Sequence, residues 1–270
     1  MVGYLHGSDD AEQKRLEAQA RYLGGIDFLR PLQTGLSVLD VGCGTGAIAR
    51  EVAARVAPAR VVLVDRCPVQ IRTARRLAAA ADAGKMHFLC GDAGALPLPE
   101  ASFDGVFGRF VLEHVSDPES AIAEMCRVVR PGGWVCAYEW EPGSFVNHPR
   151  SEPIDRVWQA IYDLQEELGG DPWIARKLFA LFSRVEELDD VAVEVRAWTV
   201  TALDIDRLRP YVEAARQVFR EARDGLLSRG WVTEDVLARA DQDYDRLVRS
   251  PEAFVSHGFG RAVARRRRNR

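Results

Sequence analysis

The stretch that decides the fold of this chain is Val38-Leu39-Asp40-Val41-Gly42-Cys43-Gly44-Thr45-Gly46. An apolar run ends in an acid, glycines follow at alternate positions, and helix-forming residues come next. This order predicts a strand, a tight turn and a helix. Glycines in such a turn let a ligand approach the backbone, and the helix start offers N–H groups without helical partners. We therefore expect a site for a nucleotide-like cofactor at this turn.

The bulk composition indicates a protein with one sizeable core. The chain has 270 residues, 47% of them hydrophobic, and a net charge of −4. It contains no apolar run of about eighteen residues or more, so we expect no transmembrane helix, and residues 1–25 are too charged for a secretory signal. The cysteines form no CxxC pair, which favours a reduced, cytoplasmic protein. They are Cys43, Cys67, Cys90, Cys126 and Cys136.

A basic run, Arg265-Arg266-Arg267-Arg268-Asn269-Arg270, stands out against the acidic balance. One interpretation is a contact with a nucleic acid or another acidic surface. The other is a solvated tail, which we favour because a single terminal run without interleaved aromatic residues is a weak nucleic-acid signal.

Short apolar runs alternate with helical patterns along the chain. This alternation predicts an α/β fold: a Rossmann-like, doubly wound, mostly parallel sheet of seven strands with helical insertions that form a lid. The predicted strands are 36–41, 61–65, 87–90, 103–107, 134–140, 191–201 and 253–265. The predicted helices are 8–23, 46–56, 67–81, 117–129, 151–168, 173–187, 208–226 and 233–248.

Ligands of such sheets bind beyond the carboxyl ends of the strands. Asp65 ends the second predicted strand, about 20 residues after the glycine turn, where an acid accepts hydrogen bonds from both ribose hydroxyls. Asp92 follows the third strand, where a carboxylate can accept from the exocyclic amine of adenine. Phe103-Asp104 opens the fourth strand, and residues 128–133 turn the chain into the fifth. The glycine spacing differs from the G-x-G-x-x-G pattern of dinucleotide-binding proteins, which makes an NAD enzyme the weakest hypothesis.

Taken in order, these motifs resemble those of the class I S-adenosylmethionine (SAM)-dependent methyltransferases that act on small molecules, similar to the type 11 and type 25 groups. The resemblance is strong over residues 36–140, which it implies to be the SAM-binding core of a single domain, 1–270. Residues 4–20 resemble an N-terminal segment that folds over the cofactor in one subgroup, so we expect a helical cap over 1–30. Residues 151–170 and 204–249 are then the helical lid.

The resemblance also implies roles for individual residues. It implies that the backbone of Gly42 and Gly44 contacts the methionine part of SAM, that Asp65 holds the ribose and that Asp92 takes the adenine amine. The remaining cofactor-binding residues that it implies are Gly46, Arg66, Ala93, Arg109 and Tyr4. Asp40 is expected to orient the turn or a water.

His114 is the candidate catalytic base. It follows the fourth strand on the ligand side of the sheet, and a histidine accepts a proton near neutral pH. The alternative is that His114 shapes the pocket without transferring a proton. Weaker candidates for the base are Glu139, Glu141, His148, Tyr4 and His6.

Aromatic residues gather after the fifth strand and predict an acceptor pocket for a small molecule. For any single ring, packing in the core is the competing interpretation. The candidates are Trp140, Trp158, Tyr162 and Trp173. The five histidines lie without close metal-ligand partners, so no metal site is expected.

Two further functions stay open. A nucleic-acid or protein methyltransferase would need a basic groove or a flipped-base pocket, which the acidic balance disfavours. The fold with SAM bound can also serve a non-methylating role, such as cyclisation or elimination. We expect a monomer or homodimer without nucleic-acid or membrane partners.

Overall fold

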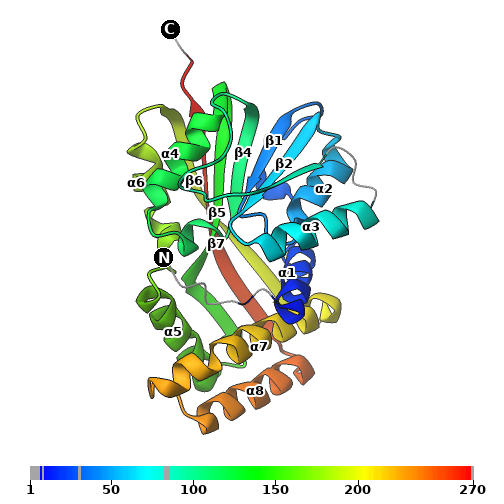
Figure 1. Ribbon diagram of the computed structural model, residues 1–270. Helices are drawn as coiled ribbons and strands as arrows, with labels where there is room; N and C mark the ends of the chain where they lie inside the picture. Colours follow the sequence, from blue (N-terminus) through cyan, green and yellow to red (C-terminus); the bar gives the residue numbers. More distant parts are fainter. Residues whose placement is uncertain (1–6, 8, 30–31, 82–85, 269–270) are drawn as a thin grey trace.

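The computed structural model describes residues 7, 9–29, 32–81 and 86–268. A seven-stranded sheet forms its centre, in the order β3-β2-β1-β4-β5-β7-β6 (Figure 1). The first five strands in the chain are parallel, and β7 is antiparallel to both β5 and β6. The predicted doubly wound, mostly parallel sheet is confirmed. Its strands are β1 (Ser37–Val41), β2 (Arg60–Asp65), β3 (Met86–Cys90), β4 (Phe103–Arg109), β5 (Val129–His148), β6 (Leu188–Thr201) and β7 (Phe254–Arg266).

The prediction for the fifth strand was too short, because β5 continues past Trp140 to His148. Pairing with β7 resumes at Val146 after a register shift that follows Glu141. Pro142 lacks an N–H and Gly143 lacks a side chain to pack, so in sequence they indicate the end of a strand. A bulge absorbs both residues here and lets the strand continue.

Helices cover both faces of the upper sheet, and a second group lies at its lower end (Figure 1). Side-chain caps begin several of them, as at Asp117, which accepts a hydrogen bond from the Ser120 N–H at 3.0 Å. The helices are α1 (Asp10–Tyr22), α2 (Ala47–Val56), α3 (Pro68–Ala80), α4 (Pro118–Val128), α5 (Glu152–Glu167), α6 (Leu178–Ser183), α7 (Ile205–Ser228) and α8 (Glu234–Arg249). Short 3₁₀ turns are η1 (Asp27–Leu29), η2 (Leu112–His114) and η3 (Ile174–Lys177).

The helix predicted over 173–187 is wrong as a single element. It is η3 followed by the six-residue α6, which ends at Ser183. Contact with a distant strand explains this break in the helix. Ala175 packs closely against Gly260 of β7, and a Cβ added to Gly260 would lie 2.9 Å from the Ala175 Cβ. The tighter 3₁₀ turn accommodates this close approach.

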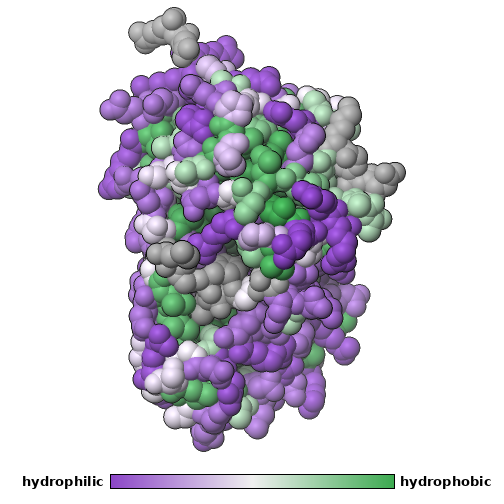
Figure 2. Space-filling view, in the orientation of Figure 1, coloured by the Kyte–Doolittle hydropathy of each residue, from purple (hydrophilic) through white to green (hydrophobic). Residues whose placement is uncertain are grey.

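The core has two levels that share strands β5 and β7. The upper level packs α2, α3, α4 and α6 on the sheet, and Ala137 and Ala262 belong to it. The lower level packs α5, α7 and α8 around the extended ends of β5 and β7, where Phe259 and Val255 are fully buried. The outer surface of α7 and α8 is mostly hydrophilic (Figure 2). These helices therefore bury an apolar face against the strands and expose a polar one.

Two observations bear on membranes and metals. Among the residues described, none of the helices combines the length and apolarity needed to cross a bilayer. Over the same residues, histidine, cysteine and carboxylate side chains nowhere gather in a group of three or more that could hold a metal ion.

Candidate active site

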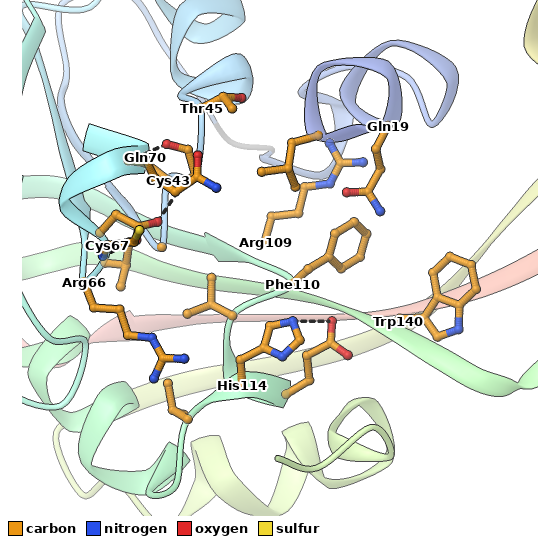
Figure 3. Close-up of a pocket in the computed structure, with 18 of the residues that line it drawn as sticks. Gln19, Cys43, Thr45, Arg66, Cys67, Gln70, Arg109, Phe110, His114 and Trp140 are labelled. Atoms are coloured by element: carbon orange, nitrogen blue, oxygen red, sulfur yellow. Dashed lines mark hydrogen bonds and ion pairs between the residues drawn. The ribbon is translucent and has the colours of Figure 1, made fainter. Parts of the chain in front are cut away.

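One cavity of about 620 Å³ opens at the carboxyl ends of β1, β2 and β4 and runs under α1, α5 and α7. This volume is ordinary for a small-molecule site. In Figure 3, Cys43, Gln70 and Arg66 lie at one end and Trp140 at the other, with Arg109, Phe110 and His114 between them. The cavity therefore joins the glycine turn to helices α5 and α7.

The glycine turn approaches its neighbours so closely that side chains are excluded. Gly42 has a φ of +67°, and an added Cβ would lie 2.4 Å from a methyl of Val111. Gly44 has a φ of +52° and donates its N–H to the Asp65 carboxylate at 2.8 Å. Gly42 and Gly44 line the cavity, whereas Gly46 begins α2 outside the lining. The glycine turn thus exposes mainly backbone atoms to the cavity.

Asp65 and Asp92 reach the same end of the cavity from neighbouring strands. Asp65 accepts the N–H groups of Gly44 and Cys67, both at 2.8 Å. Burial raises the pKa of Asp65, and these two hydrogen bonds oppose the rise. Asp92 closes a small turn by accepting the Gly94 N–H at 2.7 Å. Arg66 and Ala93 also line the cavity, while Tyr4 and His6 lie outside the described residues.

Two buried charged groups, Asp40 and Arg109, face the middle of the cavity. The Arg109 guanidinium lies over the ring of Phe110, 4.9 Å from its centroid, and two of its nitrogens, Nε and Nη1, have no hydrogen-bond partner among the described residues. Burial lowers the pKa of Arg109. Asp40 is 3% exposed, and its Oδ2 also lacks a partner. Burial, and then the charge of Asp65, raises the pKa of Asp40.

His114 sits on η2 at the junction between the turn and the lid, in a small polar cluster with Glu113 and Gln165. The Gln165 amide nitrogen donates to the Glu113 carbonyl at 3.2 Å and to its carboxylate at 3.1 Å, and it lies 3.4 Å from Nδ1 of His114. The Glu113 carboxylate lies 3.7 Å from Nε2. Gln165 and Glu113 thus approach the two ring nitrogens of His114 from different sides.

The other candidate bases in the described residues do not line the cavity. Glu139 is fully buried and accepts the N–H groups of Val111 and Leu112, at 3.2 and 3.0 Å, so it holds η2 in place. Glu141 forms an ion pair with Arg176 at 2.6 Å. His148 has a side chain 60% exposed and lies near Glu252. The expectation that these residues face the acceptor is wrong, because β5 turns their side chains to other partners.

The aromatic residues divide into those that line the cavity and one that does not. Trp140, Trp158 and Tyr162 line it, and Trp158 stacks on Tyr162 with ring centroids 5.9 Å apart. Trp173 lies outside the lining, where it meets Tyr162 edge to face and stacks under Arg176.

Helix α1 covers the cavity from the side of the glycine turn. Its residues Arg15, Leu16 and Gln19 line the cavity. The Glu17 carboxylate accepts from the Thr45 hydroxyl at 2.6 Å and from Arg50 at 2.7 Å, which ties α1 to the turn and to α2.

Comparison with known proteins agrees with this geometry. Residues 39–137 match the family described as "Methyltransferase domain". This part of the chain is therefore similar to the methyltransferase domain of SAM-dependent enzymes. An O-methyltransferase of Pyrenophora dematioidea is 34% identical over 142 residues, 49% of this chain and 51% of the relative. The 27-O-demethylrifamycin SV methyltransferase of Amycolatopsis mediterranei is 38% identical over 133 residues, 47% of each chain. The chain thus spans about half the length of these curated relatives.

Solved structures of the methyltransferase fold extend the likeness to the whole chain. A putative methyltransferase from Bacillus halodurans has a TM-score of 0.58 at 17% identity, covering 97% of this chain and all of the other. The [4+2]-cyclase SpnF has a TM-score of 0.54 at 23% identity, covering 96% of this chain and 82% of the other. At such identities these matches show the fold alone.

The cavity of the methyltransferase domain fits the family's cofactor. SAM carries a carboxylate and an ammonium on its methionine part, and among the described residues the buried Nε and Nη1 of Arg109 and Oδ2 of Asp40 have no hydrogen-bond partner. Buried charges normally have partners, so a zwitterionic ligand complements both groups.

Sequence reasoning missed several residues of the cavity. Gln70, at the start of α3, is 4% exposed with an unpartnered Oε1, and Tyr211 enters the cavity from α7. The order of motifs carries no signal for either residue, because both belong to helices that also look like ordinary amphipathic packing elements.

Proposed function

We propose that this chain is a SAM-dependent methyltransferase that transfers a methyl group to a small organic acceptor. One observation supports this most directly. A single cavity connects the glycine turn, the carboxylate of Asp65 and the unpartnered Arg109 to an aromatic end under the lid, with His114 between the two parts. A cofactor site and an acceptor site that share one enclosed space are what group transfer requires.

Different residues along this cavity bind different parts of the cofactor. Gly42 and Gly44 admit the cofactor to the backbone, Asp65 accepts from its ribose, and Asp92 and Ala93 hold its adenine with Arg66 beside them. Arg109 and Asp40 hold the two charges of the methionine part. When bound, the cofactor supplies a methyl group on a positively charged sulfur. The chain contributes alignment and the exclusion of water.

His114 acts as the base on the acceptor in this proposal. Burial lowers its pKa below the usual 6.5, so the ring is neutral at pH 7. The ring nitrogen of the neutral form that carries no proton accepts the one that the attacking group loses. Trp140, Trp158 and Tyr162 form the wall against which the acceptor lies, whereas the position of Trp173 behind Tyr162 supports only an indirect role.

Calorimetry with S-adenosylhomocysteine tests the cofactor site, and release of that compound from SAM in the presence of an acceptor panel tests the reaction. We expect binding to the native chain and at least about a tenfold weaker affinity for Asp65→Ala, since hydrogen bonds to a charged group are each worth about 1.5–3 kcal/mol. Unchanged affinity in the variant would remove Asp65 from the proposal. Absence of binding to the native chain would end the proposal.

The two other candidate functions have less support. Arg265 and Arg266 end β7 and Arg267 follows it, and all three bind carbonyl or carboxylate oxygens of the protein itself. Arg265 and Arg267 are nevertheless exposed, so the run stays a solvated surface segment in this proposal. The support for a non-methylating role is limited to the fold shared with a cyclase. An assay for the release of S-adenosylhomocysteine distinguishes this role from methyl transfer.

A further inference from the structure

The acceptor end of the cavity is free of charge among the described residues. Every side chain that β5, α5 and α7 contribute to the lining is uncharged, from Trp140 and Trp158 to Ala214 and Val218. The charged groups of the lining lie on α1, at or just after the carboxyl ends of β1 to β4, on η2 or at the start of α4. The two halves of the cavity therefore differ in kind: the cofactor half is polar and the acceptor half is apolar.

Two of the large rings at this end bond their polar atoms to residues outside the cavity lining. The indole N–H of Trp158 donates to the Tyr244 hydroxyl at 3.0 Å, and the Tyr211 hydroxyl bonds Nε2 of His257 at 2.9 Å. Neither Tyr244 nor His257 lines the cavity. Burial lowers the pKa of His257 to about 3, so the second layer behind the wall is also uncharged at neutral pH. Trp158 and Tyr211 thus present ring carbons.

Three of these rings follow one another with their planes roughly parallel. The planes of Trp140 and Trp158 meet at 28° with centroids 6.4 Å apart, and those of Trp158 and Tyr162 meet at 21° with centroids 5.9 Å apart. An aromatic ligand that packs against these rings gains ring–ring contacts in addition to the burial of its apolar surface.

Two polar groups lie at this end of the cavity: the amide of Gln165, and the indole nitrogen of Trp140, which is buried and has no hydrogen-bond partner among the described residues. Gln165 is the side chain of α5 that carries a polar amide into the lining, and it directs its nitrogen toward Nδ1 of His114. Figure 3 shows His114 and Trp140 on the same side of Arg109, with His114 nearer the glycine turn. A ligand that lies on the aromatic face therefore meets hydrogen-bonding groups at the end that points to the cofactor.

We propose that the acceptor is an uncharged aromatic molecule with a hydroxyl group, bound with its rings on the face of Trp140, Trp158 and Tyr162 and its hydroxyl at His114. This assignment rests on the proposed function for the fate of the hydroxyl, but the preference for a neutral ring system is a property of the cavity itself. A carboxylate, phosphate or ammonium on the far side of the ring would lose its hydration and find no counter-charge, which is costly.

Three phenols that differ only in the charge of the side chain provide the test: 4-propylphenol, 3-(4-hydroxyphenyl)propanoate and tyramine. Each is titrated at pH 7 into the native chain saturated with S-adenosylhomocysteine, with heat or indole fluorescence as the readout. We expect the neutral phenol to bind at least about tenfold more tightly than either ion, because an uncompensated buried charge costs more than the 1.4 kcal/mol of a tenfold change. Equal or tighter binding of an ion overturns the assignment, and so does failure of the neutral phenol to bind.

A charged residue introduced into the lining of the acceptor end provides an independent test of the proposal. Val218→Lys adds an ammonium to the lining from α7, and Val218→Met is the matched uncharged control of similar length. We expect the lysine variant to move the preference toward the propanoate by at least about tenfold and the methionine variant to keep the native order. No shift in the lysine variant, with its fold verified by its thermal transition, contradicts the position of the acceptor.

Failure of this inference differs from failure of the proposed function. If S-adenosylhomocysteine does not bind, the methyltransferase proposal fails, while the same three phenols titrated without it still report whether the wall prefers a neutral ring. If S-adenosylhomocysteine binds and is released from SAM with a charged acceptor, methyl transfer stands and the acceptor class proposed here is wrong.

Discussion

Arg109 shows how a single residue in this chain is placed for a ligand at a cost to the free protein. Its guanidinium is buried between the rings of Phe28, Phe110 and Tyr138. Contacts with ring faces recover part of the lost hydration, but two nitrogens, Nε and Nη1, stay without hydrogen bonds among the described residues. A group of this kind is destabilising until an anion reaches it.

Replacing this arginine is therefore expected to move stability and affinity in opposite directions. Arg109→Met keeps the length of the side chain and removes the buried charge, so we expect an unchanged or higher melting temperature and at least about a tenfold loss of affinity for S-adenosylhomocysteine. Differential scanning fluorimetry and calorimetry measure the two effects. Arg55→Met, on the exposed face of α2, is the control and should leave the affinity unchanged. A variant that lost stability and kept its affinity would show that the arginine serves the fold.

His114 leads to a prediction about pH. Burial holds the pKa of this histidine below its usual 6.5, and the nearby Glu113 carboxylate partly opposes that shift. The neutral ring is the base, so kcat/KM should rise with pH through this lowered pKa and be flat above it. His114→Gln keeps a hydrogen-bonding side chain and should lose both the acidic limb and most of the rate. Identical pH profiles for the two proteins would assign His114 to the shape of the pocket.

At the scale of elements, α1 is held in place by contacts with segments far away in the chain. The Glu17–Arg50 ion pair and the Glu17–Thr45 hydrogen bond join it to the glycine turn, and Trp198 of β6 donates its indole N–H to the Tyr22 carbonyl at the end of the helix. The helix thus lies between the cofactor loop and the lid. Because it lies over the cavity, we predict that α1 helps to retain the cofactor.

Weakening this tie should release the cofactor faster. Glu17→Gln removes the charge that Arg50 pairs with, and we expect S-adenosylhomocysteine affinity to fall about three- to tenfold, mainly through a higher dissociation rate. Stopped-flow fluorescence measures that rate. Glu167→Gln breaks a comparable ion pair with Arg229 on the lid surface and serves as control. Equal rates in both variants would mean that α1 does not retain the ligand.

At the scale of the whole molecule, β5 and β7 join the two levels of the core. Trp134 and Cys136 belong to the upper level, while Phe259 and Val255 of the paired strand lie among the lid helices. Loss of the lower level would expose the same strands that the upper sheet needs. The two levels are therefore expected to unfold together.

Urea denaturation tests this expectation with two probes. Far-ultraviolet circular dichroism reports the helices and sheet of both levels, and indole fluorescence is weighted toward the lid and the ends of β5 and β6, where Trp140, Trp158 and Trp198 lie. We expect coincident transitions with one midpoint. A fluorescence midpoint at lower urea would mean that the lid unfolds on its own, and would favour treating residues 151–170 and 204–249 as a separate unit.

The local order of residues was enough for the glycine turn, the strand-end acids and the sheet. Gly42, Gly44, Asp65 and Asp92 were predicted for one end of one cavity, and the structure brings them there because parallel strands end at a common edge. Their binding roles, like the division into core, cap and lid, the cytoplasmic location and the oligomeric state, stay predictions. Sequence also indicated α5, α7 and α8 from their helical periodicity.

Only the tertiary structure determined which way side chains point and which distant segments pack together. Glu139 turns inward to hold η2, the bulge in β5 carries the strand past Pro142, and the close approach at Gly260 breaks the expected helix after 173. The charge-free aromatic wall is likewise assembled from β5, α5 and α7, which lie far apart in the chain. Backbone periodicity and turn chemistry act over a few residues, so sequence can reveal them. Which side chain meets which across a cavity depends on contacts between distant segments, and those exist only once the chain has folded.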